Sequence, residues 1–373
     1  MTADRDAVRQ PDPARLDAAR SVIADLMARH SVPGSSVAVT SAAGLLYAEG
    51  FGHRDLATGS PATPETRYLW FSMTKIATAT TALRLADEGR LDLDAPVHDL
   101  VPSFRARGGP QPQVRQLLDH TAGAANPLPL RWVLPADRST ADVRSRSAEL
   151  LRRYGAPRRP ARAPARYSNV GYLVLAEVIA RAAGRPVEDV VRRCVLEPAG
   201  MSATDYEHSE PSDSATGYVR VPRAATPLLR AALPRHLVGA RHGEHVALRR
   251  FRVVGAGYGG LIGSVTDAAR LLQLHLADGV IDGNRVLRPG TARAMRRIAT
   301  PGRPFDLGLG WFRRPADRDA VPAFVEHWGT GGGFWNAMRL YPDLDLGVVV
   351  MANTTRSYEH DLLMRDLVTA FAP

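Results

Sequence analysis

The chain has 373 residues, of which 45% are hydrophobic and 23% charged, so it can bury a full core and is long enough for about two domains. Its formal net charge of +10 would suit a nucleic-acid-binding protein, but the arginines are scattered among acids, and the densest basic cluster, at 152–166, has no aromatic partners for base stacking. Composition therefore argues against nucleic acid as a partner, and the single cysteine, Cys194, excludes an internal disulfide.

The first twenty residues are charged and contain neither the apolar core of a signal peptide nor a twin-arginine pair. No uninterrupted apolar stretch approaches the length needed to cross a membrane. We therefore expect a cytoplasmic protein without a membrane partner. The sequence leaves the oligomeric state open.

In chain order, the first predicted element is a helix at 12–30, where apolar residues recur at helical spacing. Two strands follow at 36–40 and 45–48. A helical pattern then runs over 73–88, and Gly89 is well placed as its C-terminal cap. Further helices, separated by Pro-rich connections, are predicted at 114–118, 140–154, 170–183 and 186–195. The poorly periodic stretch 211–251 is interpreted as a long loop that is a candidate wall of a substrate site.

The last part of the chain begins with a predicted helix at 264–276 and ends with one at 358–371. Strands are predicted between them at 308–312, 323–327, 334–340 and 346–351. Strands near both ends with helices between them predict an α+β fold, in which an antiparallel sheet built from both termini is flanked by helices and carries an inserted, mainly helical region. The predicted division assigns 1–71 and 266–373 to the sheet region and 72–265 to the helical region, with its long loop at 211–251.

The most informative local feature is Lys75, the only lysine among the 48 basic residues, three positions after Ser72 where a helical pattern begins. Residues at i and i+3 on a helix face the same way. Unlike arginine, a desolvated lysine can lose its proton and accept one from a neighbouring hydroxyl. The positive end of the helix dipole would disfavour the protonated amine and favour negative charge near Ser72. The alternative is that Ser72 only caps the helix beside a solvated Lys75.

A second polar group, Tyr167-Ser168-Asn169, stands directly before the helix predicted at 170–183. Ser168 or Asn169 is a natural N-cap, and Tyr167 could simply pack beside it. A purely structural role is therefore an alternative for this group as well.

A third group lies at 326–333, between two predicted strands, and contains His327, Gly329 and Thr330 within a glycine-rich run. Glycine-rich backbone can approach a substrate closely and direct N–H groups at an oxyanion. The same run is also typical of a hairpin turn with a surface histidine.

Other local signals point to competing functions and are weaker. The run 253–260 matches a dinucleotide fingerprint, but a capping box at Ser264 predicts that the helix starts later, so we expect no cofactor. Asp119 and His120 are adjacent and generally point apart, which argues against a Ser-His-Asp triad with Ser72; His120 is expected to hold a loop. The histidines at 242–245 lack the spacing of a helical zinc site, and no metal is expected.

Taken together, the three groups resemble the motifs of the serine β-lactamase and penicillin-binding-protein superfamily, specifically its class C β-lactamase-like branch of esterases and peptidases. Ser72-Met73-Thr74-Lys75 resembles the first motif, Tyr167-Ser168-Asn169 the Tyr-x-Asn motif, and His327-Trp328-Gly329 the third. The segments 117–123, 197–201 and 259–264 are similar as well, and motif order and spacing agree over about 14–370.

The resemblance implies that Ser72 is the nucleophile, Lys75 its activating partner and Tyr167 a proton carrier. It implies that Asn169 orients Lys75 and contacts the substrate, and that backbone N–H groups of Ser72 and Thr330 form the oxyanion hole. Here His327 stands where class C β-lactamases have a lysine. A fixed cation is thus replaced by an imidazole, which we expect to be switchable with pH.

This departure favours uncharged esters or amides over β-lactams, with His327, Gly329 and Thr330 as substrate-binding residues beside Asn169. The sequence therefore predicts a serine hydrolase of small-molecule esters or amides, most simply a carboxylesterase with weak or no β-lactamase activity. The alternatives are an acyltransferase that uses the same acyl-enzyme, a D-amino-acid peptidase or β-lactamase, and a non-enzymatic sensor that resembles penicillin-binding proteins.

Overall fold

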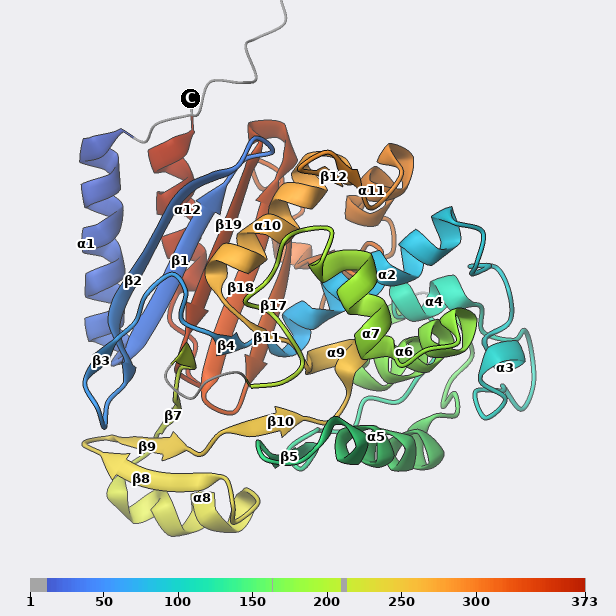
Figure 1. The fold of residues 1–373 in the computed structure, drawn as a ribbon, viewed down its shortest axis with the longest axis horizontal. Helices are drawn as coiled ribbons and strands as arrows, with labels where there is room; N and C mark the ends of the chain where they lie inside the picture. Colours follow the sequence, from blue (N-terminus) through green and yellow to red (C-terminus); the bar gives the residue numbers. More distant parts are fainter. Residues whose placement is uncertain (1–11, 163, 209–212, 373) are drawn as a thin grey trace, which may run out of the picture.

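The computed structural model describes residues 12–162, 164–208 and 213–372 (Figure 1). The first eleven residues, which entered the argument against a signal peptide, and residues 211–212 of the predicted loop lie outside this description. None of the helices in the described parts of the chain combines the length and apolar character that a membrane span requires.

An eight-stranded antiparallel sheet forms the centre of the fold, in the order β15-β16-β17-β18-β19-β1-β2-β3. The N-terminal strands are β1 (Gly34–Thr40), β2 (Leu45–Asp55) and β3 (Ser60–Pro61). The C-terminal strands are β15 (Asp306–Leu307), β16 (Phe312–Arg313), β17 (Val325–Gly331), β18 (Phe334–Tyr341) and β19 (Leu346–Ala352). Because β1 pairs with β19 from Ser35↔Ala352 to Thr40↔Gly347, both ends of the chain meet in one sheet, as predicted.

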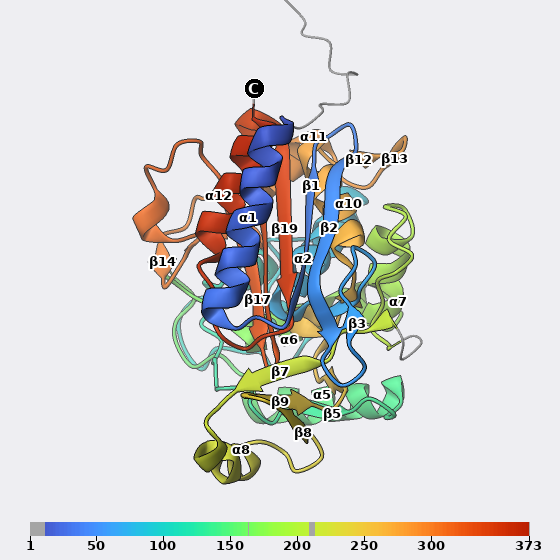
Figure 2. The same ribbon diagram turned by 90° about the vertical axis from the view of Figure 1, so that its left-hand side faces the viewer.

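Helices cover both faces of this sheet (Figures 1 and 2). On one face lie α1 (Pro13–His30) and α12 (His360–Phe371), and on the other lies α10 (Val265–Leu276). Alternate strand residues serve the two faces: Val37 and Val350 pack in the cluster with α1 and α12, whereas Ala38 and Val349 pack in the cluster with α10. Every residue of β1 and β19 is buried, which agrees with the continuous apolar sequence of β19.

The helical region packs against the far side of α10 (Figure 1). It contains α2 (Thr74–Asp87), α3 (Val97–Leu100), α4 (Val114–Leu118), α5 (Thr140–Tyr154), α6 (Asn169–Ala183), α7 (Val187–Val191) and α9 (Ala256–Gly259). The predicted helices in this region are confirmed to within a few residues. Helix α2 is buried over most of its length because the sheet and the other helices surround it.

The prediction of a long loop at 211–251 is wrong for most of its length. A three-stranded sheet, in the order β7-β9-β8, occupies it with a short helix. These elements are β7 (Gly217–Arg220), α8 (Thr226–Ala232), β8 (Val238–His242) and β9 (His245–Leu248), followed by β10 (Phe251–Val253), which pairs with β5 (Val133–Pro135). Elements of three to seven residues are too short to produce a recognisable period in a polar sequence.

Two smaller expectations also need correction. The predicted strand at 308–312 is a hairpin of β15 and β16 in which Gly310 adopts φ +98°, a conformation that suits glycine. A one-turn helix, α9, does open within the glycine run 255–260, before α10 starts at its Ser264 cap. A Cβ at Gly257 would lie 2.3 Å from the carbonyl oxygen of Tyr172, so this glycine serves close helix packing.

The remaining short elements are β4 (Tyr68–Leu69), β6 (Ala165–Arg166), β11 (Ile262–Gly263), β12 (Val280–Ile281), β13 (Asn284–Arg285), α11 (Pro289–Arg296) and β14 (Gly302–Arg303). Among the described residues, the strands of the eight-stranded sheet come only from 34–61 and 306–352. The division at 71/72 and 265/266 into two domains stays a prediction.

Candidate active site

Ser72 lies in a single 3₁₀ turn, Phe71–Met73, that leads directly into α2. Phe71, just before it, has φ +45°, which is rare and strained for a bulky residue. Strand β17 holds this turn closely: a Cβ at Gly331 would lie 2.1 Å from the Phe71 ring, and one at Gly329 would lie 1.9 Å from the Trp70 carbonyl oxygen. Glycine at both positions therefore lets strand β17 pack directly against the turn that carries Ser72.

Lys75 is fully buried, and its amine has three polar neighbours. Nζ lies 2.9 Å from Ser72 Oγ, 2.9 Å from Asn169 Oδ1 and 3.2 Å from the carbonyl oxygen of Tyr258. A carbonyl oxygen and an amide oxygen can only accept hydrogen bonds. In a neutral amine, these two acceptors take both N–H groups, and the remaining lone pair faces the Ser72 hydroxyl.

Electrostatics favours the neutral amine. Desolvation by burial lowers the pKa of Lys75 well below its ordinary value of 10.5. The rings of Tyr167, Tyr258 and Tyr172 lie 4.8, 5.3 and 5.6 Å from Nζ and would favour a cation. Among the described residues no carboxylate pairs with the amine, so the cost of desolvation dominates.

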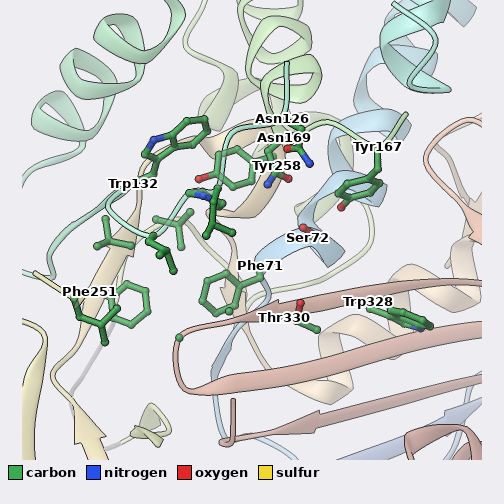
Figure 3. A pocket seen from close by; sticks show the side chains of 18 of the residues that line it. Phe71, Ser72, Asn126, Trp132, Tyr167, Asn169, Phe251, Tyr258, Trp328 and Thr330 are labelled. Carbon is green, nitrogen blue, oxygen red and sulfur yellow. Dashed lines mark hydrogen bonds between the residues drawn. The ribbon is translucent and has the colours of Figure 1, made fainter. Parts of the chain in front are cut away.

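The segment 167–169 both caps a helix and brings polar side chains to Ser72 and Lys75. Ser168 is the N-cap of α6: its Oγ accepts a hydrogen bond from the Gly171 N–H at 2.9 Å and donates one to the Ala125 carbonyl at 2.5 Å. This cap places Asn169 against Lys75 and Tyr167 beside Ser72 (Figure 3). Burial raises the pKa of Tyr167, and a hydrogen bond with Ser72 offsets this only partly, so the phenol stays protonated at neutral pH.

His120 holds this segment in place. Its Nδ1 accepts a hydrogen bond from the Ser168 N–H at 3.1 Å, and its ring stacks on Tyr167 with 4.6 Å between centroids. Burial lowers the pKa of His120 to about 3, so the ring is neutral. The expectation that His120 pins a loop agrees with these contacts.

The third predicted group lies on β17, opposite Ser72. Thr330 is exposed and stands beside Ser72 in Figure 3, whereas Gly329 is buried. His327 is only 1% exposed and does not line the cavity next to Ser72. Its Nδ1–H donates to the Trp328 carbonyl at 2.8 Å. Desolvation lowers the pKa of His327 well below 6.5, so the ring is neutral at neutral pH, whereas the sequence suggested a cation that switches with pH.

A cavity of about 400 Å³ opens in front of Ser72 (Figure 3). None of the described residues that line it carries a charge. Apolar side chains dominate its wall, among them Leu128, Leu130, Trp132, Leu237, Leu248 and Phe251. We call this space the apolar chamber. The last three residues come from the stretch 211–251, which was expected to line the substrate site.

A buried ion-pair network supports β17 from behind. Glu326, His360 and Asp361 lie close enough together to share a cation. Arg339 already supplies that charge, because its guanidinium donates to Glu326 at 2.5 Å and also to Asp361. The cluster therefore fixes the strand ahead of His327 and does not need a metal ion.

Sequence reasoning missed the third partner of Lys75, the Tyr258 carbonyl, and most of the chamber wall. Every residue has a main-chain oxygen, so the sequence does not indicate which one contacts Lys75. The chamber wall includes Trp132, Phe305 and Phe312, which come from segments far apart in the chain. Their aromatic character is the only sequence signal that could have indicated a role in the wall.

Comparisons with known proteins show relatives that match most of the chain. The family model described as Beta-lactamase matches residues 19–372. Esterase EstB of Burkholderia gladioli is 30% identical over 377 residues, which cover 93% of this chain and 91% of EstB.

Two solved structures show the same fold. The D-amino acid amidase of Ochrobactrum anthropi SV3 has a TM-score of 0.77 at 20% identity, over 95% of this chain and 98% of the amidase. EstCE1, described as a hydrolase with promiscuous acyltransferase activity, has a TM-score of 0.70 at 22% identity, over 95% of this chain and 98% of EstCE1. The predicted fold class is thus confirmed.

Proposed function

The chain belongs to the beta-lactamase family of serine hydrolases, as its motifs predicted, and we propose that it is a carboxylesterase that acts on apolar acyl groups through an acyl-Ser72 intermediate. The arrangement of Ser72, Lys75 and Tyr167 supports the chemistry. The uncharged apolar chamber supports the substrate class.

In the proposed acylation step, Ser72 Oγ attacks the ester carbonyl carbon while its proton moves to the lone pair of neutral Lys75. Asn169 and the Tyr258 carbonyl hold the two N–H groups and so keep that lone pair on Ser72. Backbone N–H groups of Ser72 and Thr330 would stabilise the oxyanion.

Tyr167 is the proposed donor to the leaving oxygen. Its protonated phenol forms a hydrogen bond with Ser72, and its ring lies 4.8 Å from Lys75 Nζ. In the proposed step Tyr167 gives its proton to the leaving oxygen and is reprotonated by Lys75, which holds the proton that Ser72 released. The alcohol then leaves, and a water molecule attacks the acyl-enzyme by the reverse proton route. Free acid forms, and Ser72 regains its proton.

The main evidence for this choice of substrate is that none of the lining residues that the structure describes carries a charge. An acyl group that carries a carboxylate would be buried in this chamber without a cation, which is unfavourable. His327 does not replace the missing cation, because it is neutral and lies outside the chamber lining. Esters of uncharged acyl chains avoid this cost.

The test is a series of 4-nitrophenyl esters with acyl chains of increasing length, compared with nitrocefin and a D-alanyl dipeptide. Each added methylene should raise kcat/KM by up to roughly fourfold until the chamber is full. Ser72→Ala should abolish hydrolysis, while Ser103→Ala, at an exposed serine outside the chamber, should not. Faster turnover of nitrocefin than of every ester would overturn the proposal.

The alternatives give different products in the same assay. An acyltransferase would form a new ester when an alcohol acceptor is added, at the expense of free acid. A sensor would show a persistent acyl adduct by intact mass, with no turnover.

A further inference from the structure

A second cavity, of about 680 Å³, adjoins the apolar chamber at Tyr167. The two cavities share Tyr167 and Asn126 as lining residues. The charged residues that line this second cavity are all arginines, namely Arg158, Arg159, Arg166 and Arg303. We call it the arginine groove.

The four arginines concentrate positive charge in this groove. Many arginines elsewhere pair with acids, as Arg115 does with Asp94. The four groove arginines are exposed, and no carboxylate in the described parts of the chain pairs with them or lines the groove with them. Their mutual repulsion is therefore not balanced by the protein itself.

The strand register increases this repulsion. Strand β6 runs parallel to β14, and Arg166 is the register partner of Arg303. Like charges placed side by side on neighbouring strands are destabilising. A bound anion would relieve that cost and gain hydrogen bonds from planar guanidinium groups, which match carboxylate and phosphate oxygens.

The backbone of the groove is fixed in advance. The N–H groups of Arg158 and Arg159 both donate to the Gly123 carbonyl, at 2.9 and 3.3 Å. Gly123 has φ +73°, and a Cβ there would lie 2.1 Å from the Arg159 carbonyl oxygen, so the close approach requires glycine. The preceding residues of the same loop include His120, which positions the Tyr167 segment. Little backbone ordering is thus left for a ligand to induce.

We propose that the arginine groove binds a carboxylate or phosphate on the leaving group of the substrate. This inference rests on the proposed function, in which Tyr167 protonates the leaving oxygen. The acyl chain occupies the uncharged chamber, so the leaving group extends past Tyr167 into the groove. The bond between the carbonyl carbon and the leaving oxygen breaks, the bond to Ser72 Oγ forms, and the Ser72 proton ends on the leaving oxygen. The distal anion is unchanged by the reaction.

The experiment compares butyrate esters of three phenols that carry a para acetamide, carboxylate or phosphate group. The readout is the ratio of kcat/KM for each anionic ester to that for the neutral acetamide ester. In the wild-type protein this ratio should exceed one and fall as salt is added. In Arg166→Gln and Arg303→Gln it should drop roughly three- to tenfold each. Arg107→Gln, at an exposed arginine outside both cavities, is the matched control and should leave the ratio unchanged.

The outcomes separate this proposal from the proposed function. Failure of the wild-type protein to hydrolyse even the neutral ester would overturn the esterase itself. Hydrolysis of the neutral ester without any preference for anionic esters, or with a ratio that neither groove variant lowers, would overturn the groove alone. Preference for the carboxylate or the phosphate ester identifies which anion is recognised.

Discussion

Lys75→Met replaces the buried amine by a thioether of similar length, so it removes the proposed proton acceptor of Ser72 without opening a cavity. The apolar stem of the side chain already packs in the core. Methionine is flexible enough to fill the same space. The variant therefore separates the chemistry of the amine from its packing.

The loss of activity should be large. A positioned general base contributes about 10²- to 10⁴-fold to rate, so kcat/KM for a 4-nitrophenyl ester should fall by about that factor, equivalent to roughly 3 to 5 kcal/mol. Lys75→Arg should also be inactive, because arginine keeps its proton.

Although Lys75→Met should lower activity, it should raise the free energy of unfolding. Burial holds the pKa of Lys75 well below its ordinary value, so the amine binds its proton more weakly in the folded chain than in the unfolded chain. This difference destabilises the fold at every pH at which the unfolded chain, with a pKa of about 10.4, keeps the proton. The methionine variant avoids that cost and should be more stable at pH 7.

The pH dependence gives the decisive measurement. Because the unfolded chain binds the extra proton, the stability of the wild-type protein should rise with pH from the folded pKa up to about 10.4. The methionine variant should lack this contribution, so the difference between the two should shrink as the pH approaches 10.4. Urea unfolding of both proteins at several pH values measures this difference in the free energy of unfolding. A constant stability difference across this range, or a variant that keeps its esterase activity, would refute the reasoning.

Two further predictions concern neighbours of Ser72. Tyr167→Phe should slow hydrolysis of an ethyl ester by about 10²- to 10³-fold but that of a 4-nitrophenyl ester much less, because nitrophenolate leaves without a proton; equal losses would exclude Tyr167 as the donor. Gly329→Ala should lower kcat/KM at least tenfold and destabilise the fold by about 1 to 3 kcal/mol, because its Cβ would meet the Trp70 carbonyl at 1.9 Å. Gly290→Ala, on α11 with nothing within 4 Å, is the control, and unfolding curves and ester kinetics of both variants provide the comparison.

The sequence alone determined the features that depend on local order. Helical periodicity placed the long helices, and apolar runs near both termini predicted the sheet that β1 and β19 complete. The spacing of Ser72 and Lys75, and the positions of the Tyr167 and His327 groups, identified the family, because a motif is a short local pattern. Short elements such as those at 217–248 carry too few residues to show a period, so the sequence predicts only a loop there.

Tertiary structure decided the features that depend on distant neighbours. Lys75 meets Asn169 and the Tyr258 carbonyl across 94 and 183 residues, and its burial in the packed fold lowers its pKa. His327 is neutral for the same reason, although its sequence position suggested a switchable cation. Likewise, Arg166 and Arg303 become neighbours only through strand pairing. Desolvation and charge proximity depend on which distant residues pack together in the folded chain. They therefore cannot be predicted from local sequence patterns.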